Sequence, residues 1–210
     1  MIIDYGSGNL HSVAKSFQAV ANRSTRGVIE VSREPIVVGK ADRIVLPGVG
    51  AFADCKNGLI QNPLLLKAIK HQVLVKKVPF LGICVGHQML ASYGFEHEVT
   101  TRGLNWIEGR VVPILSPKID LKIPHMGWNS LFFDRSHYLF QGIKEGSDVY
   151  FVHSYHLVPN NMKNRLAYTN YGQRITASVI KNNMIGTQFH PEKSQEIGLK
   201  FIENFLTWTP

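Results

Sequence analysis

A chain of 210 residues is long enough for one well-cored domain and too short for two of ordinary size, so we expect a single domain over residues 1–210. Apolar residues make up 44% of the sequence and charged residues 18%, with no apolar run of membrane-span length, which excludes a membrane protein. The net charge of +8 comes from scattered lysines and arginines, without a basic stretch interleaved with aromatics, so nucleic acid is not an expected partner.

The first half of the chain alternates short apolar runs with helical patterns, which predicts a parallel sheet covered by helices on both faces. The expected elements of this half are strands at 1–4, 43–46 and 78–83, a helix with apolar positions from Leu10 to Val20, a helix starting at Pro63, and a helix at 88–93.

The second half consists mainly of short strands separated by turns, and it closes with one amphipathic helix. We expect strands at 106–112, 119–123, 148–153, 165–169, 178–180 and 184–189, and a helix that carries Ile197, Phe201, Phe205 and Trp208 on one stripe. The predicted fold is therefore a three-layer α/β domain, with a mixed, mostly parallel central sheet and antiparallel additions in its C-terminal half. Open α/β sheets place their sites at the carboxyl ends of strands, here at residues 47–50, Cys84 and His190.

The segment Gly82-Ile83-Cys84-Val85-Gly86 joins a predicted strand to a helix. A nucleophile between two glycines at this junction has the form of a nucleophile elbow, because glycine lets the backbone turn sharply. The alternative is a small buried cysteine on a core strand. We predict that Cys84 is a catalytic nucleophile.

A second candidate segment is Gly186-Thr187-Gln188-Phe189-His190-Pro191-Glu192. In an extended backbone, residues two apart face the same way, so His190 and Glu192 can point together. Cysteine, imidazole base and orienting carboxylate are the groups that covalent acyl transfer requires. Alone, the segment could equally be a structural turn.

Acyl transfer also requires hydrogen-bond donors for the developing oxyanion. The N–H of Val85 follows the nucleophile directly, and the glycine-flanked backbone at Val49 and Gly50 can supply a second donor if a peptide there turns inward. The alternative for this loop is an ordinary turn at the end of a strand.

Cys55 and Cys84 are the only cysteines, and no CxxC or Cys/His spacing typical of a metal site is present. This cysteine usage suits a reducing cytoplasm, and the N-terminal residues lack the basic and apolar regions of a signal peptide. We expect a cytoplasmic protein with no metal and no cofactor.

The segments 82–88 and 187–192 resemble the two signatures of the class I, triad-type, glutamine amidotransferases. Further motifs resemble the branch of that family that serves imidazole glycerol phosphate synthase in histidine biosynthesis, and they extend the resemblance over most of the chain. These motifs are Asp4-Tyr5-Gly6-Ser7-Gly8-Asn9-Leu10, Pro47-Gly48-Val49-Gly50-Ala51-Phe52, Pro124-His125-Met126-Gly127-Trp128-Asn129 and Phe151-Val152-His153-Ser154-Tyr155.

The resemblance implies that Cys84 attacks the side-chain amide of glutamine, with His190 as base and then acid and Glu192 as its orienter. It assigns the oxyanion hole to the main chain at Val85 and at Val49–Gly50. The implied glutamine-binding groups are the Gln88 side chain, the backbone at Ser154 and Tyr155, and the carboxylate of Glu96, with Glu98 as an alternative to Glu96.

The resemblance also implies a protein partner, because ammonia is useful only if it reaches its acceptor unprotonated. The partner is expected to be a separate cyclase subunit with a (β/α)₈ barrel. The residues expected at the docking face and ammonia exit are Tyr5, Asn9, His125, Met126, Trp128, Asn129, Tyr150 and Lys193, among which Trp128 could instead be folded over a surface turn.

Two positions depart from the pattern of this branch, which more often has methionine at the position of His87 and glycine at that of Asn105. A related glutaminase that supplies ammonia to a sugar-modifying amidotransferase in surface-polysaccharide synthesis shares nearly all the motifs and is the main alternative. Two further alternatives are a cysteine peptidase and a catalytically silent protein that only regulates its partner. The absence of a recognisable peptide groove argues against the first, and the complete set of Cys84, His190 and Glu192 argues against the second.

Overall fold

The computed structural model describes residues 1–24, 27–115 and 121–210, and a large mixed β-sheet forms its centre. Strands at one side of this sheet are parallel, and those at the other side alternate in direction. In spatial order the strands are β2 (Val31–Ser32), β1 (Ile2–Ile3), β3 (Ile44–Gly48), β4 (Phe80–Cys84), β14 (Met184–Thr187), β13 (Gln173–Lys181), β12 (Arg165–Tyr171) and β9 (Phe132–Phe133). The mixed sheet with antiparallel strands from the C-terminal half is confirmed.

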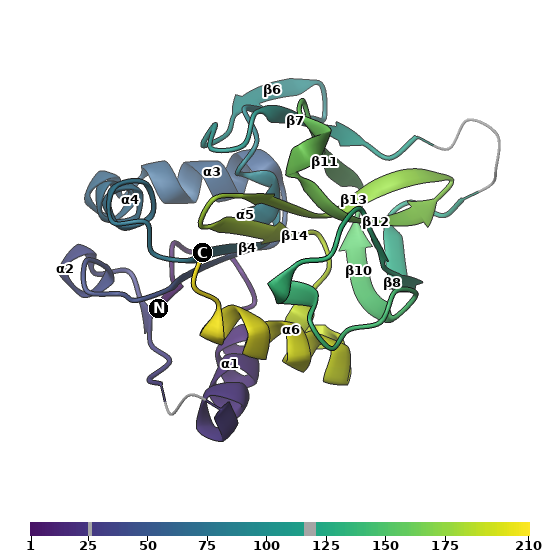
Figure 1. Ribbon diagram of the computed structural model, residues 1–210. Helices are drawn as coiled ribbons and strands as arrows, with labels where there is room; N and C mark the ends of the chain where they lie inside the picture. The colour runs from purple at the N-terminus through teal and green to yellow at the C-terminus, as the bar shows by residue number, and fades with distance from the viewer. Residues whose placement is uncertain (25–26, 116–120) are drawn as a thin grey trace.

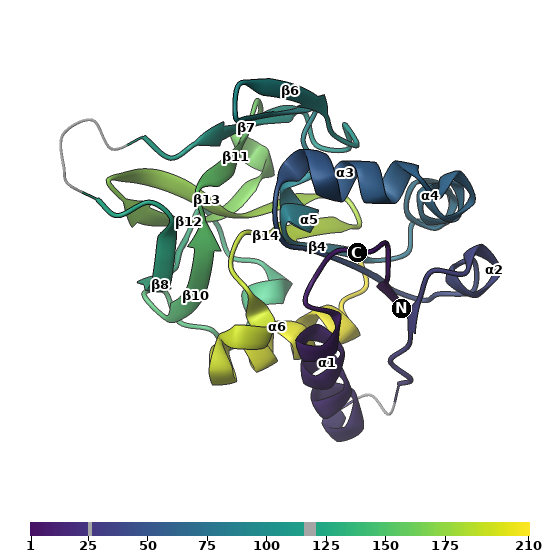
Figure 2. The same cartoon turned by 180° about the vertical axis from the view of Figure 1, so that it is seen from behind.

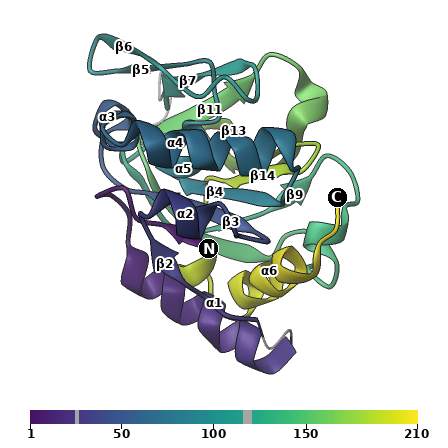
Figure 3. The same ribbon diagram turned by 90° about the vertical axis from the view of Figure 1, so that its left-hand side faces the viewer.

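Helices cover both faces of this sheet, which gives the three layers (Figures 1 and 3). One layer contains α3 (Phe52–Ile60), α4 (Pro63–Lys70) and α5 (Val85–Gln88), and the other contains α1 (Leu10–Ser24) and α6 (Gln195–Thr207). The short α2 (Pro35–Val38) lies beside the β2 edge. The apolar stripes predicted for α1 and α6 meet, with the rings of Phe17 and Phe205 in edge contact at 6.3 Å between centroids. No helix in the described ranges has the length and hydrophobicity needed to cross a membrane.

Two smaller sheets pack beside the central one, as the view from behind also shows (Figure 2). One is the antiparallel pair β10 (Asp148–His153) and β8 (His125–Ser130). The other has the order β11 (Tyr155–Pro159), β7 (Gly109–Pro113), β5 (Tyr93–Glu96) and β6 (Val99–Arg102). Ser154 alone separates β10 from β11, so the chain passes from one small sheet to the other at a predicted substrate-binding residue. Short helical turns occupy His71–Val75, Tyr138–Phe140, Met162–Asn164 and Pro191–Lys193.

The helix predicted at 88–93 is wrong, because α5 already ends at Gln88 and Tyr93 begins a strand. Backbone N–H groups of residues 104–107 donate to the carbonyls of Met89, Leu90 and Ala91, which prevents those carbonyls from accepting the bonds of a longer helix. The same bonds shorten the strand predicted at 106–112, which starts only at Gly109.

The strand predicted at 119–123 lies partly outside the described residues, which omit 116–120, and its remaining residues 121–123 are not in a strand. Pairing begins at His125, in a strand that the sequence did not predict. The strand predicted at 184–189 ends at Thr187, so His190 follows the strand by three residues.

The strand that leads to Cys84 is completely buried and pairs with β3 on one side and β14 on the other. Gly82 in this strand and Gly86 in α5 are required because three backbone segments meet at this point. A Cβ on Gly82 would lie 2.5 Å from the Gly86 carbonyl oxygen, and a Cβ on Gly86 would overlap the Leu46 carbonyl oxygen. The start of α5 therefore lies directly against the main chain of β3 and β4.

We predict that Gly86→Ala lowers the free energy of unfolding by about 2–3 kcal/mol, because the added methyl group meets backbone that cannot move aside. Gly39→Ala is the matched control: Gly39 follows α2 with an ordinary φ of −63°, and its substitution should change stability by less than about 1 kcal/mol. Urea unfolding of both variants measures the difference. Equal stabilities would show that the elbow has room for a side chain.

Candidate active site

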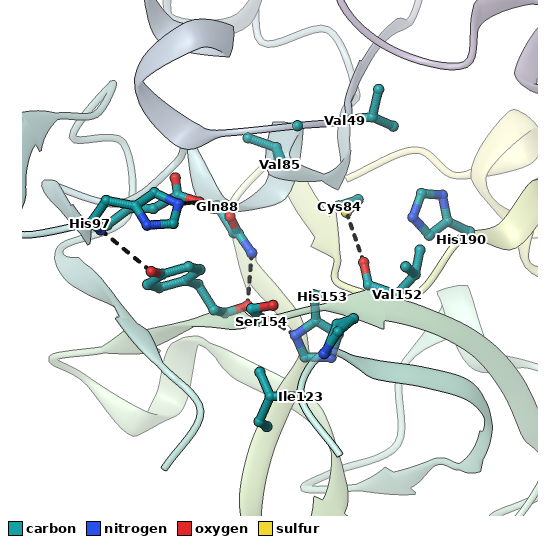
Figure 4. Close-up of a pocket in the computed structure, with 14 residues that line it drawn as sticks. Val49, Cys84, Val85, Gln88, His97, Ile123, Val152, His153, Ser154 and His190 are labelled. Carbon is teal, nitrogen blue, oxygen red and sulfur yellow. Dashed lines mark hydrogen bonds and ion pairs between the residues drawn. The ribbon is translucent and has the colours of Figure 1, made fainter.

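A pocket of about 510 Å³ opens at the carboxyl ends of β3 and β4, beside the segment that follows β14 (Figure 4). It gathers segments that are far apart in the sequence. All of the predicted nucleophile, oxyanion and substrate residues line it, together with the predicted base: Val49, Gly50, Cys84, Val85, Gln88, Glu96, Ser154, Tyr155 and His190.

Cys84 occupies a strained turn between β4 and α5. Its φ of 55° and ψ of −111° lie where side-chain-bearing residues are rare, as a nucleophile elbow requires. The Sγ atom lies 3.9 Å from the Val152 carbonyl oxygen, and the Gln188 amide nitrogen donates to it at 3.8 Å. The thiol therefore reaches the pocket while its residue is only 5% exposed.

His190 lies next to Cys84 in the pocket (Figure 4), and its ring is held from behind by Glu192. The distance from His190 Nδ1 to Glu192 Oε1 is 2.8 Å, and both side chains are almost fully buried. The expected alignment is present, but its expected cause is wrong: Glu192 lies in the helical turn Pro191–Lys193 and not in an extended strand. Within the described residues no group other than the neighbouring Cys84 sulfur interacts with His190 Nε2, so this nitrogen can exchange a proton with the thiol.

The electrostatics of this group favour a charged imidazole. Burial alone would lower the pKa of His190, but the neighbouring Cys84 sulfur and the Glu192 carboxylate raise this pKa to about 10. A buried carboxylate that accepts from Nδ1 also selects the tautomer that leaves Nε2 facing the sulfur. The arrangement can therefore take a proton from the thiol and hold it as imidazolium.

The loop after β3 is fastened on the side away from the pocket. The Val49 carbonyl oxygen accepts hydrogen bonds from the Ser7 hydroxyl at 2.9 Å and from the Cys55 thiol at 3.3 Å. Because the N–H and C=O of a planar trans peptide point in opposite directions, the Gly50 N–H points away from Ser7 and Cys55. Gly50 has a φ of +94°, a conformation that suits glycine.

Hydrogen bonds fix both predicted substrate-binding side chains, Gln88 and Glu96. Gln88 Nε2 donates to the Tyr155 carbonyl oxygen at 2.9 Å and to Gln188 Oε1 at 3.0 Å. The Glu96 carboxylate accepts from the Phe52 N–H at 2.5 Å, at the start of α3. Glu96 lines the pocket and Glu98 does not, which favours Glu96 as the acidic group of this site.

The predicted docking face is brought together only in part. Met126 and Trp128 are 61% and 48% exposed on β8. The Trp128 ring meets that of Tyr150 at 6.0 Å, and Lys193 Nζ lies 5.6 Å from the Tyr150 centroid. We call Met126, Trp128, Tyr150 and Lys193 the aromatic face.

Two predicted members of this face are buried instead. Tyr5 is 7% exposed and its hydroxyl donates to the Pro47 carbonyl at 2.7 Å, so it holds the end of β3 from the protein interior. His125 is 2% exposed and lies behind the face. Asn9 and Asn129 are partly buried, and the Asn9 carbonyl accepts from the Val13 N–H at the start of α1.

The two departures noted in the sequence lie outside the pocket lining. His87 is fully buried against Gly186, and burial lowers its pKa to about 3. Asn105 has a positive φ of 58° and accepts from the Ser92 hydroxyl at 2.6 Å. Sequence reasoning also missed Gln188, whose amide contacts both Cys84 and Gln88, although it lies two residues before the predicted base.

Comparison with known proteins agrees with this geometry. The profile of the family "Glutamine amidotransferase class-I" matches residues 1–208. Proteins named imidazole glycerol phosphate synthase subunit HisH are 50% identical in Cereibacter sphaeroides, 51% in Ruegeria pomeroyi and 52% in Rhodopseudomonas palustris. Each alignment covers 100% of this chain, and 99%, 98% and 98% of the respective relative.

Solved structures with the same fold are more distant in sequence. A crystal structure of a glutamine amidotransferase aligns with a TM-score of 0.70 at 14% identity, over 98% of this chain and 99% of that one. A glutamine amidotransferase from Thermotoga maritima aligns with a TM-score of 0.59 at 16% identity, over 98% and 80% of the two chains. At these identities the likeness concerns the fold alone.

We predict that iodoacetamide modifies Cys84 much faster than Cys55. Cys84 borders the pocket beside His190, whereas Cys55 is enclosed and burial raises the pKa of its thiol. Cys84→Ala should slow labelling of the folded protein about tenfold or more, and Cys55→Ala should leave the rate unchanged. Intact-mass spectrometry over time measures both. Fast labelling that survives Cys84→Ala would contradict this assignment.

Proposed function

Because the chain belongs to the class-I glutamine amidotransferase family, we propose that it is the glutamine-hydrolysing subunit of an imidazole glycerol phosphate synthase, acting in histidine biosynthesis. The observation that carries the proposal is the Cys84 elbow beside the buried His190–Glu192 pair. Relatives of 50–52% identity over the full chain favour this pathway over the sugar-modifying alternative.

The proposed reaction begins with the Cys84 proton held on His190 Nε2, where the raised pKa of that ring favours it, and Cys84 Sγ then attacks the amide carbon of the glutamine side chain. The imidazolium then returns that proton to the amide nitrogen and the carbon–nitrogen bond breaks. Ammonia departs, and a γ-glutamyl thioester remains on Cys84. Water, deprotonated by His190, cleaves the carbon–sulfur bond and releases glutamate while Cys84 recovers its proton. Glu192 keeps Nδ1 protonated throughout and stabilises the imidazolium.

The oxyanion of each tetrahedral intermediate is proposed to accept from the main-chain N–H groups of Val85 and of the Val49–Gly50 loop. Such a donor is worth roughly a hundredfold or more in rate. The fastened Val49 carbonyl, which turns the Gly50 N–H away from Ser7 and Cys55, supports this role. Gln88, Glu96 and the backbone at Ser154 and Tyr155 would hold the glutamine.

The ammonia requires a second polypeptide, because free ammonium in water at neutral pH is not nucleophilic. We propose a cyclase subunit with a (β/α)₈ barrel as the partner, docked on the aromatic face. The exposed Met126 and Trp128 support this placement, since tryptophan is favoured at interface centres and methionine is enriched in interfaces. The pocket extends towards β8 through Ile123 and Pro124, in the direction that ammonia would take.

The test of this function is the division of labour between the subunits. Cys84→Ala should abolish imidazole glycerol phosphate synthesis from glutamine and leave synthesis from added ammonium salts unchanged in the complex with a histidine-pathway cyclase. The nucleophile serves only the glutamine reaction, so both activities failing together would refute the proposed roles. Wild-type glutamate release that neither the cyclase nor its nucleotide substrate stimulates would keep the glutaminase and reject this pathway.

We predict that Glu192→Gln moves the alkaline limit of glutamine hydrolysis to lower pH. The imidazolium of His190 donates a proton to the leaving ammonia, so the rate falls as the pH rises through the pKa of His190, which is about 10. Without the Glu192 carboxylate this pKa falls, and loss of a charge-assisted hydrogen bond of about 1.5–3 kcal/mol corresponds to about 1–2 pH units. A pH profile of glutamate release by the complex measures the limit. An unchanged limit would show that a group other than His190 sets it.

We predict that Trp128→Ala weakens binding of the cyclase about tenfold to a hundredfold, as loss of a central interface aromatic does. The ring is half exposed and contacts Tyr150 across the β8–β10 pair, so its removal should change the melting temperature little. Calorimetric titration and a thermal melt separate the two effects. Early melting with normal affinity would instead make Trp128 a structural residue.

A further inference from the structure

A chain of hydrogen bonds runs through two buried histidines from Asn129 in β8 to the pocket. His125 and His153 lie opposite each other in the β8–β10 pair, and His125 Nδ1 is 3.0 Å from His153 Nε2. His153 Nδ1 is 2.9 Å from the Tyr155 carbonyl oxygen. At the other end of the chain, the side-chain nitrogen Nδ2 of Asn129 is 3.1 Å from His125 Nε2.

The direction of every bond in this chain follows from its ends. The Tyr155 carbonyl can only accept, so His153 Nδ1 carries a hydrogen. Burial lowers the pKa of His153 to about 3 and that of His125 to about 4, so both rings are neutral near pH 7. The unprotonated Nε2 of His153 then accepts from Nδ1–H of His125, and Nε2 of His125 accepts from the Asn129 amide.

Asn129 itself is held in one orientation. Its Oδ1 accepts from the Ser130 N–H at 2.8 Å, and its Nδ2 also donates to the Asn170 carbonyl at 3.1 Å. The His125 ring is stacked on Tyr171, with 4.0 Å between centroids, and on Phe151, with 4.8 Å. Each nitrogen of the two rings therefore has a partner, and neither ring can change tautomer alone.

At the pocket end the chain meets the proposed glutamine subsite. The Tyr155 carbonyl that accepts from His153 also accepts from Gln88 Nε2 at 2.9 Å. His153 itself lines the pocket together with Ser154 and Tyr155 (Figure 4). The position of the Gln88 amide therefore depends on a carbonyl that His153 holds.

We propose that His125 and His153 are positioning residues for glutamine, which hold the Tyr155 carbonyl and through it Gln88. They act as neutral Nδ1–H tautomers in a hydrogen-bond chain anchored at Asn129. This role rests on the proposed glutaminase function and adds two residues to it that do not react with the substrate.

The test compares variants of His153 in the complex with the cyclase. His153→Phe keeps a buried ring but removes both hydrogen bonds, and it should raise KM for glutamine about tenfold while kcat changes less than about threefold. In His153→Asn the side-chain nitrogen replaces Nδ1 as the donor to Tyr155, so KM should return to within about threefold of wild type. His156→Phe is the matched control, since His156 is also buried but lies outside the hydrogen-bond chain and the pocket lining.

A second measurement does not depend on activity. Nitrogen-15 NMR of the histidine rings in the wild-type chain should show Nδ1–H tautomers for both residues at pH 7, with assignments from His125→Phe and His153→Phe. An Nε2–H tautomer or a charged ring at either position would overturn the proposal. So would an unchanged KM in His153→Phe, or an equal rise in His156→Phe. Failure of wild-type glutamine hydrolysis would count against the proposed function instead, because the tautomers can be measured without it.

Discussion

The close approach of three backbone segments beneath Cys84 is the constraint on which the rest of this structure depends. The β3 main chain, the end of β4 and the first turn of α5 meet where Gly48, Gly82 and Gly86 have no room for a side chain. This contact places the loop after β3 beside Cys84, and it keeps Cys84 in the strained turn that brings its sulfur to the pocket. Main-chain packing therefore fixes the position of the pocket, and the polar side chains project into it from these backbone segments.

The parts of the site that could be predicted are those that follow from sheet geometry. Parallel strands end at one edge, so Cys84 and the segment around His190 had to meet once their strands were recognised. The small sheets could not be predicted, because the pairing of β8 with β10 and of β7 with β5 joins short segments through long-range contacts. The burial of Tyr5 and His125 could not be predicted either. Both residues belong to motifs that suggest an exposed docking face, but packing places them in the interior. The contact between His190 and Glu192 was expected from an extended backbone, in which residues two apart face the same way. Residues 191–193 form a helical turn instead, so the contact has a different cause.

Buried histidines in this chain have opposite electrostatic characters, although all of them are removed from water. Burial lowers the pKa of His87, His125 and His153, and no anion in the described part of the chain offsets this effect. His190 is equally buried, yet a carboxylate and a sulfur raise its pKa. The site thus keeps one ring ready to carry a proton, while the buried rings of His125 and His153 stay uncharged.

The backbone at Cys84 has a consequence for how this position can evolve. A φ of 55° with a ψ of −111° is a conformation that glycine adopts with less strain than any side-chain-bearing residue. Under the proposed role of Cys84, selection for a stable fold and selection for a reactive thiol therefore act in opposite directions on the same residue. A lineage that no longer needed the reaction would be expected to lose this cysteine early, while the glycines around it, which the packing itself requires, would persist as a trace of the former chemistry.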